Sequence, residues 1–214
     1  MNILEGIDIS HHNWHVIKTY GAEWLQKMSR EGFVIMKLTE GVSFDDPKAA
    51  AYMLMIAEAD DSRPPAVGFY HYARPEYNTA EEEAKHFLQQ LRNVYEYKRG
   101  AVLALDVEGR ALQVKNLDEW CLTWCNYVYH ATGVKPLIYC QKSAVKLFEK
   151  CAASDYGLWI AAWSSTKPRK VSPWPFLAIW QWSSLGLDKD YFFGTHTQWF
   201  KYAGVEYNGV FTYQ

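Results

Sequence analysis

The chain has 214 residues, 49% of them hydrophobic, and a formal net charge of -2. This length and hydrophobicity predict a single globular domain over residues 1–214 and exclude a disordered chain. Because there is no basic excess, nucleic acid is not an expected partner. No apolar run reaches the roughly 18 residues that a membrane span requires.

Seven short apolar segments predict β-strands, and helical patterns fill several of the gaps between them. The predicted strands are Ile3–Ser10, Phe33–Thr39, Ala66–Ala73, Ala101–Glu108, Pro136–Cys140, Leu158–Trp163 and Phe176–Trp182. Thr79 and Glu82 form a capping box that predicts the start of one helix. Asn116 and Glu119 resemble a second cap, and Gly133 ends the helix that follows. Strands alternating with helices are typical of a parallel sheet, so we predict an α/β fold, a compact TIM-like barrel.

The four cysteines are predicted to be buried thiols in the reduced form. Cys121 and Cys125 lie four residues apart on the apolar face of a predicted helix, and this spacing matches no zinc motif. Cys140 and Cys151 follow later in the chain. A protein of this size does not need a disulfide scaffold to fold.

Polar side chains gather where the first four predicted strands end. They are Asp8 and Ser10, Thr39 and Glu40, Tyr70, His71 and Tyr72, and Asp106 and Glu108. In parallel barrels the active site forms at the C-terminal ends of several strands. We therefore expect these residues to converge on one site.

Asp106 and Glu108 are the sharpest feature of the sequence. Residues two apart on a strand point to the same face, roughly 6.6 Å apart along the backbone. Repulsion between two such carboxylates raises the pKa of one of them. A proton donor beside an ionised carboxylate is what cleavage of a glycosidic bond requires. A solvated strand end and a metal site are the alternatives.

A metal site would need His71 together with Asp106 or Glu108, as in metal-dependent hydrolases or deacetylases of sugars. The sequence contains no HxH or HExxH spacing, so no metal and no cofactor are predicted. His71 is better explained as a hydrogen-bonding residue of the pocket or of the core.

The chain after Ser164 is rich in Trp and Pro and shows no clear helix, so loops are expected to join the last strands. Alternation in LAIWQWSS places Trp180 and Trp182 on one face and Gln181 on the other. Trp163 and Trp182 are the best placed to form a flat platform for a sugar ring near the strand ends. Packing in the core is the alternative for each Trp.

Seven segments together resemble glycoside hydrolase family 25, the Chalaropsis-type lysozymes. They run in order from about Gly6 to Thr195 and read GIDIS, GFVIMKLTEG, VGFYHYARP, LALDVEG, LWIAAW, AIWQWSS and LDKDYFFGT. The resemblance implies an irregular barrel of five β/α units followed by about three further strands. It also implies N-acetylmuramidase activity, which cuts the β-1,4 bond between N-acetylmuramic acid and N-acetylglucosamine in peptidoglycan.

The resemblance also implies roles for four acids. Glu108 resembles the family's general acid/base, and Asp106 resembles the acid that assists through the N-acetyl group of the substrate, which favours retention of configuration. Asp8 and Asp188 resemble the two supporting carboxylates. This chain reads Asp188-Lys189-Asp190 where the family usually reads Asp-x-Asn, so the supporting role falls on Asp188 or on Asp190.

Eight further residues are expected to bind the glycan. They are Lys37, Tyr70, His71, Tyr72, Tyr139, Trp163, Gln181 and Trp182. The expected partner is the glycan strand of peptidoglycan, bound by a monomer without a separate wall-binding module. A metal-dependent hydrolase or deacetylase and a non-catalytic glycan-binding barrel are the alternatives. Four converging acids argue against pure binding.

The N-terminus reads MNILEGIDIS and lacks the basic and apolar regions of a signal peptide. This is expected of a phage or prophage endolysin that stays in the cytoplasm until a holin releases it to the wall. It is equally expected of a secreted enzyme from which the signal has been removed.

Overall fold

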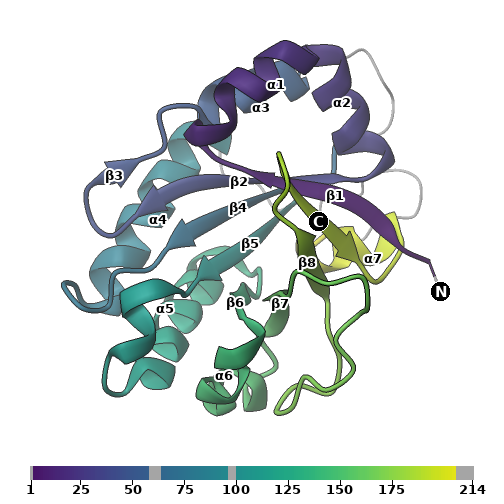
Figure 1. Cartoon of the computed structure of the whole chain (residues 1–214). Coiled ribbons are helices and arrows are strands. Elements are labelled where there is room, and N and C mark those ends of the chain that lie inside the picture. The colour runs from purple at the N-terminus through teal and green to yellow at the C-terminus, as the bar shows by residue number, and fades with distance from the viewer. Residues whose placement is uncertain (1, 58–63, 96–99, 206–214) are drawn as a thin grey trace.

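The computed structural model describes residues 2–57, 64–95 and 100–205. Its strands form one sheet at the centre of the molecule (Figure 1). They are β1 (Leu4–Ile9), β2 (Phe33–Glu40), β3 (Phe44–Asp45), β4 (Val67–Tyr72), β5 (Ala101–Asp106), β6 (Leu137–Gln141), β7 (Gly157–Ala161), β8 (Ile179–Ser183) and β9 (Asp188–Phe192). The sheet closes into a barrel because β1 pairs with both β2 and β9, and β3 pairs with β2 outside this ring.

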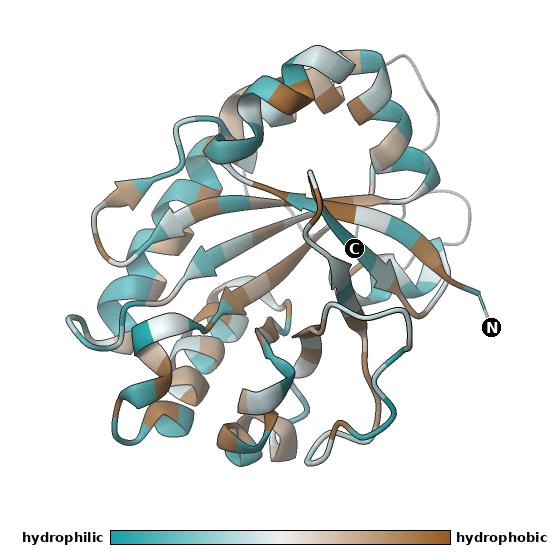
Figure 2. Cartoon of the chain, in the orientation of Figure 1, coloured by the Kyte–Doolittle hydropathy of each residue, from teal (hydrophilic) through white to brown (hydrophobic). Residues whose placement is uncertain are grey.

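Helices surround the barrel (Figure 1). They are α1 (Trp14–Tyr20), α2 (Ala22–Glu31), α3 (Ala49–Ala57), α4 (Ala80–Tyr95), α5 (Leu117–Thr132), α6 (Glu149–Ala153) and α7 (His196–Tyr202). Hydrophilic and hydrophobic residues share each of the longer helices (Figure 2), as expected of helices with one face on a core. The prediction of an α/β, TIM-like barrel is confirmed. Among the described residues, no helix is both long and apolar enough to cross a membrane.

The predicted helix ends hold with one exception. The Thr79 side chain accepts from the backbone N–H of Glu82 at 3.3 Å, and its hydroxyl donates to the Glu82 carboxylate at 2.7 Å. Gly133 ends α5 in the left-handed conformation, with φ of 72°. Asn116 precedes α5 but is itself left-handed, with φ of 56°, and its side chain makes no capping hydrogen bond. The predicted side-chain cap at Asn116 is therefore wrong.

The last strand runs against the rest of the barrel. All pairings from β1 through β2, β4, β5, β6 and β7 to β8 are parallel, whereas β9 is antiparallel to both β8 and β1. The start of β9 therefore lies at the same end of the barrel as the ends of the parallel strands. In this register Asp188 lies opposite Asp8.

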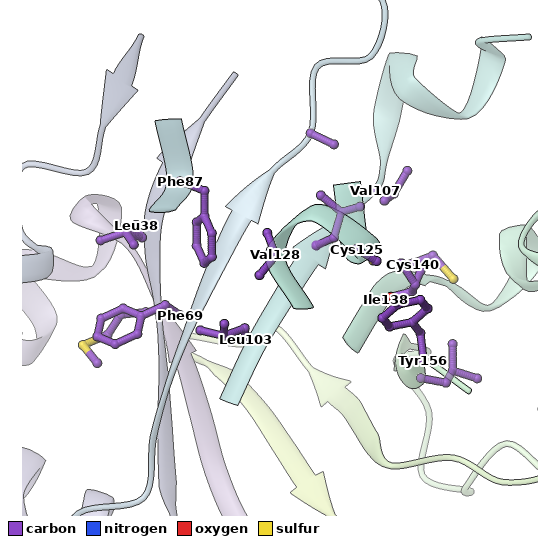
Figure 3. Close-up of a cluster of buried hydrophobic side chains, with 14 of the residues drawn as sticks. Leu38, Phe69, Phe87, Leu103, Val107, Cys125, Val128, Ile138, Cys140 and Tyr156 are labelled. Atoms are coloured by element: carbon purple, nitrogen blue, oxygen red, sulfur yellow. The ribbon is translucent and has the colours of Figure 1, made fainter. Parts of the chain in front are cut away.

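Alternation along each strand divides the core into an interior and an outer layer. On β5, Val102 and Ala104 pack inside the barrel, and Leu103 packs outside it. Figure 3 shows the outer layer, where Leu103 lies with Phe87 of α4 and Val128 of α5. The inward residues stay apolar until the mouth, where polar side chains replace them. The four cysteines are free and buried, as predicted.

Helix α7 closes the end of the barrel opposite the mouth. The Trp199 ring is fully buried and stacks on Phe33, with the ring centroids 4.5 Å apart. Thr195 caps the helix by accepting from the backbone N–H of Gln198 at 3.3 Å. The prediction of no helix after Ser164 is wrong for this segment, because a seven-residue helix shows no periodic stripe. Its position depends on contacts with β2 and β9.

Candidate active site

A cavity of about 260 Å³ opens at the mouth of the barrel. Its lining comes from seven neighbouring strands of the barrel, or from the segments that directly follow them. The lining residues are Asp8, Tyr70, Asp106, Glu108, Tyr139, Trp159, Trp163, Gln181 and Asp188. Eight of these nine residues are among those that the sequence singles out, and Trp159 is the addition. The lining is rich in acids and aromatic rings, which together suit a neutral, hydroxyl-rich ligand such as a sugar.

The four predicted acids converge here at two depths. Asp8 and Asp106 are 6% and 7% exposed, and Glu108 and Asp188 are half-buried nearer the solvent. Strand β5 ends at Asp106, two residues earlier than predicted, yet Glu108 still lines the same cavity. The backbone continues its sheet-like path, because the N–H of Val107 donates to the carbonyl of Tyr139 at 3.0 Å.

Both members of the Asp-x-Glu pair have raised pKa values. Burial and then the charge of Glu108 hold the pKa of Asp106 well above its usual range. The pKa of Glu108 is also raised, by burial first and by the charge of Asp188, while Lys37 and Arg74 oppose the rise. Asp106 is the more deeply buried of the two, so burial opposes its ionisation more strongly. The predicted repulsion is therefore present, but it acts on Asp106, and Asp188 is the acid whose charge raises the pKa of Glu108.

Asp8 is held by a chain of hydrogen bonds that crosses the mouth. Gln181 Nε2 donates to Asp8 Oδ2 at 2.7 Å. Gln181 Oε1 in turn accepts from Tyr139 Oη and from Trp163 Nε1, each at 3.1 Å. These bonds fix the orientation of the Gln181 amide. Burial, followed by the charge of Asp188, raises the pKa of Asp8 to about 7.

Asp190 and Trp159 did not emerge from the sequence as a pair. Asp190 is fully buried inside the barrel, and Trp159 Nε1 donates to its Oδ1 at 2.8 Å. Asp188 and Asp190 are two apart on β9, so both point inward, with Asp188 at the mouth and Asp190 one layer deeper. Of the two acids, Asp188 lines the cavity. The alternation of side chains along the segment LDKDYFF predicts that Asp190 faces the interior of the barrel, as Asp188 does.

A charged cluster borders the cavity beside Glu108. Lys37 Nζ contacts Glu40 Oε2 at 2.5 Å and lies 4.8 Å from the centre of the Tyr72 ring. Arg74 also pairs with Glu40 and stacks over Tyr72 at 4.7 Å. Burial, together with the charges of Glu108 and Asp106, raises the pKa of Tyr72 to about 12. Lys37 and Tyr72 thus flank the acids without lining the cavity itself.

His71 and Trp182, which were expected to bind the glycan, do not line the cavity. Neighbours on a strand face opposite sides, so His71 points out of the barrel between Tyr70 and Tyr72. It is fully buried, with Nε2 2.7 Å from Glu83 and Nδ1 2.8 Å from the Thr39 hydroxyl.

Trp182 also faces outward, as the predicted alternation with Gln181 requires. Its ring stacks on Tyr191 with the centroids 5.4 Å apart. Trp163, by contrast, lines the cavity and is 67% exposed. Of the two Trp residues predicted to form a sugar platform, the structure brings only Trp163 to the acids. Within the described ranges, no three His, Cys, Asp or Glu side chains are grouped so as to hold a metal ion.

Comparisons with known proteins identify relatives in sequence and in fold. Lysozyme M1 of Streptomyces globisporus is 26% identical over 201 residues, which cover 86% of this chain and 63% of that protein. The chain therefore spans a little under two thirds of the length of this curated relative. A family GH25 lysozyme from Aspergillus fumigatus superimposes with a TM-score of 0.74 at 26% identity, covering 94% of this chain and 99% of that one.

A muramidase from Trichobolus zukalii has the same fold, with a TM-score of 0.73 at 22% identity over 94% of this chain and 98% of that chain. The family model described as Glycosyl hydrolases family 25 matches residues 7–191. This match includes β1 from Ile7 onward with Asp8, β5 with Asp106, and β9 as far as Tyr191. The chain therefore belongs to glycosyl hydrolases family 25.

Proposed function

We propose that this chain is a lysozyme that hydrolyses the β-1,4 bond between N-acetylmuramic acid and N-acetylglucosamine in bacterial peptidoglycan. The observation that carries the proposal is the convergence of Asp8, Asp106, Glu108 and Asp188 on one cavity. Burial raises the pKa of all four acids, which favours the protonated form that a general acid in glycosidic cleavage needs.

Glu108 is the proposed proton donor. It is the half-buried member of the pair, so its proton can reach the glycosidic oxygen of a chain lying across the mouth. Protonation lets the C–O bond break and leaves positive charge on the anomeric carbon. The ionised Glu108 then takes a proton from the water that completes hydrolysis.

Asp106 is proposed to act through the substrate's N-acetyl group. Its Oδ1 is buried and has no hydrogen-bond partner among the described residues. An acetamido N–H in the cavity would donate to this oxygen and turn the acetyl oxygen toward the anomeric carbon. Neighbouring-group help of this kind predicts retention of configuration. Asp8 and Asp188 add negative charge near the positive transition state.

Residues 1–214 are proposed to form one catalytic domain that acts as a monomer and binds the glycan strand directly. Trp163 offers an exposed ring beside the acids, and Tyr70, Tyr139 and Gln181 line the rest of the cavity. The proposed place of action is the bacterial cell wall. No metal or cofactor has a part in this mechanism.

The decisive experiment is digestion of purified peptidoglycan followed by mass spectrometry of the new ends. A muramidase leaves N-acetylmuramic acid at the reducing end, a glucosaminidase leaves N-acetylglucosamine, and a deacetylase leaves the chain uncut. A parallel digestion contains excess chelator. Reducing N-acetylmuramic acid in both samples supports the proposal, whereas activity lost in chelator and restored by zinc contradicts it.

A further inference from the structure

Asp190 is an acid that the proposed mechanism does not use. It lies on β9, where it pairs with Gly6 of β1 and Gln181 of β8, and it is fully buried. Its Oδ1 accepts from Trp159 Nε1 at 2.8 Å. Its Oδ2 is buried and meets no donor among the described residues. An ionised carboxylate oxygen in such a place has lost its water without gaining a partner, which is costly.

The neighbour of Asp190 is another carboxyl group. The side chains of Asp190 and Asp8 lie within hydrogen-bonding contact of each other. Two buried carboxylates in contact cannot both be ionised, so one of them carries a proton. Asp8 already has a donor, because Gln181 Nε2 points at its Oδ2. Asp190 has an orphaned oxygen, and a proton placed there turns that oxygen into a donor.

We propose that Asp190 is a positioning residue that keeps its proton and donates it to Asp8 in a hydrogen bond. Asp8 then accepts one hydrogen bond from Gln181 on β8 and one from Asp190 on β9, and its charge is directed to the cavity. The proposal assumes that Asp8 serves the lysozyme reaction, but the proton on Asp190 can be measured without that reaction.

The surroundings agree on which acid keeps the proton. Burial and the nearby charge of Asp8 hold the pKa of Asp190 well above its usual range, against the hydrogen bond from Trp159. Asp8 has the lower pKa, about 7, because Gln181 and Asp190 both donate to it. The other titratable groups near the pair are Asp188, Glu108, Asp106, Tyr70 and Tyr139. All five are acids, so none of these neighbours supplies a cation that competes with the proton between the two carboxyls.

The first test uses D190N, because Asn has the shape and the donor of a protonated Asp. An unfolded Asp is ionised above about pH 4. Folding of the parent therefore takes up a proton at Asp190, and the parent loses stability with rising pH relative to D190N. The melting temperature of D190N should match the parent at pH 4 and exceed it by at least about 5 °C at pH 8. In D155N, which changes an exposed carboxyl, the difference should not grow with pH.

The infrared spectrum gives a second reading of the same proton. A protonated carboxyl has its own carbonyl band. The difference spectrum of the parent minus D190N at pH 8 should contain the band of Asp190, while the bands of carboxyl groups common to both proteins, such as Asp106, cancel. A melting-temperature difference that is constant from pH 4 to pH 8, or the absence of the band from the difference spectrum, would overturn the proposal.

The positioning role is tested by carboxyl-carbon NMR titration of Asp8. D190L removes the donor, so the pKa of Asp8 should rise by about one unit or more, while D190N should leave it near the parental value. The rate of lysis by D190L should fall, whereas D190N should lyse at close to the parental rate. An Asp8 pKa that is unchanged in D190L overturns the positioning role.

If D190L does not fold, the stability and infrared measurements on D190N decide alone. If the parent does not cleave peptidoglycan, the lysozyme proposal fails, but these measurements keep their meaning.

Discussion

Asp188 lies directly opposite Asp8 in the antiparallel pairing of β9 with β1. One acid comes from the first strand of the chain and the other from the last. Their pairing puts two negative groups on neighbouring strands at the mouth of the barrel, and each affects the titration of its neighbours. The charge of Asp188 raises the pKa of Asp8 and that of Glu108.

Glu108→Gln should reduce lysis of wall suspensions by about 100- to 10,000-fold, because Gln cannot deliver a proton. Folding should be unaffected, since Glu108 is half-buried and makes no hydrogen bond on which a strand depends. The matched control is Glu149→Gln on the exposed surface of α6, which should clear the suspension at the parental rate. If Glu108→Gln keeps more than about a tenth of parental activity, Glu108 is not the general acid.

Asp188→Asn should move the alkaline limb of the pH–rate profile to lower pH by about half a unit or more. The Asp188 charge raises the pKa of Glu108, so its removal lets Glu108 lose the catalytic proton earlier as pH rises. Asp106→Asn should lower the rate but leave the alkaline limb in place, because the charge of Asp106 is not among the causes that raise the pKa of Glu108. The check is the initial rate of lysis between pH 4 and 9 for both variants. A limb that moves in Asp106→Asn instead would reverse the assignment.

Trp163→Ala should weaken binding of peptidoglycan fragments with little change in melting temperature, because its ring is 67% exposed and lines the cavity. Trp182→Ala should do the opposite, since that ring stacks on Tyr191 outside the barrel. Calorimetric binding and thermal melts of the two variants separate the roles. Equal loss of affinity in both would mean that the glycan contacts the outer face of β8 as well.

His71→Phe should destabilise the fold by about 2–4 kcal/mol, since it leaves the buried Glu83 without one of its partners. Burial lowers the pKa of His71, so the folded protein holds this ring neutral. The unfolded chain binds the proton more readily. The contribution of His71 to stability is therefore complete above about pH 6.5 and is lost as pH falls through its folded pKa.

Urea unfolding at pH 7 and pH 5 measures this effect, and the loss of stability in His71→Phe should be smaller at pH 5. Lysis per folded molecule should match the parent. A His71→Phe variant that folds normally but cannot lyse the wall would show that His71 has a role in the active site.

The barrel and its main acids could be predicted because they depend on local pattern. The run AVLALD is apolar enough to identify a buried strand, and its end places Asp106 and Glu108 at the mouth. Asp188 could not be placed by the same reasoning. It begins an antiparallel strand, so it reaches the mouth from the opposite chain direction, and only pairing with β1 determines that.

The positions of His71 and Trp182 outside the cavity have a different origin. Three successive residues on a strand cannot all face one cavity, so His71 between two inward tyrosines had to point out. The alternation that places Gln181 inward likewise requires Trp182 to face outward. In both cases the residue type suggested a contact with the ligand. The alternation of side chains along the strand instead determined whether each residue faces the inside or the outside of the barrel. Helix α7 was missed because tertiary contacts of Trp199, and not a repeating pattern, hold it in place.

The insertion of β9 between β8 and β1 also determines when in its synthesis the protein becomes an enzyme. A nascent chain that has not yet emerged past Asp188 has an open sheet, with Asp8 on an unpaired edge and no closed mouth. A closed mouth is thus a property of chains that extend through β9, and fragments that end before Asp188 lack both the acid from β9 and an enclosed cavity in which to act.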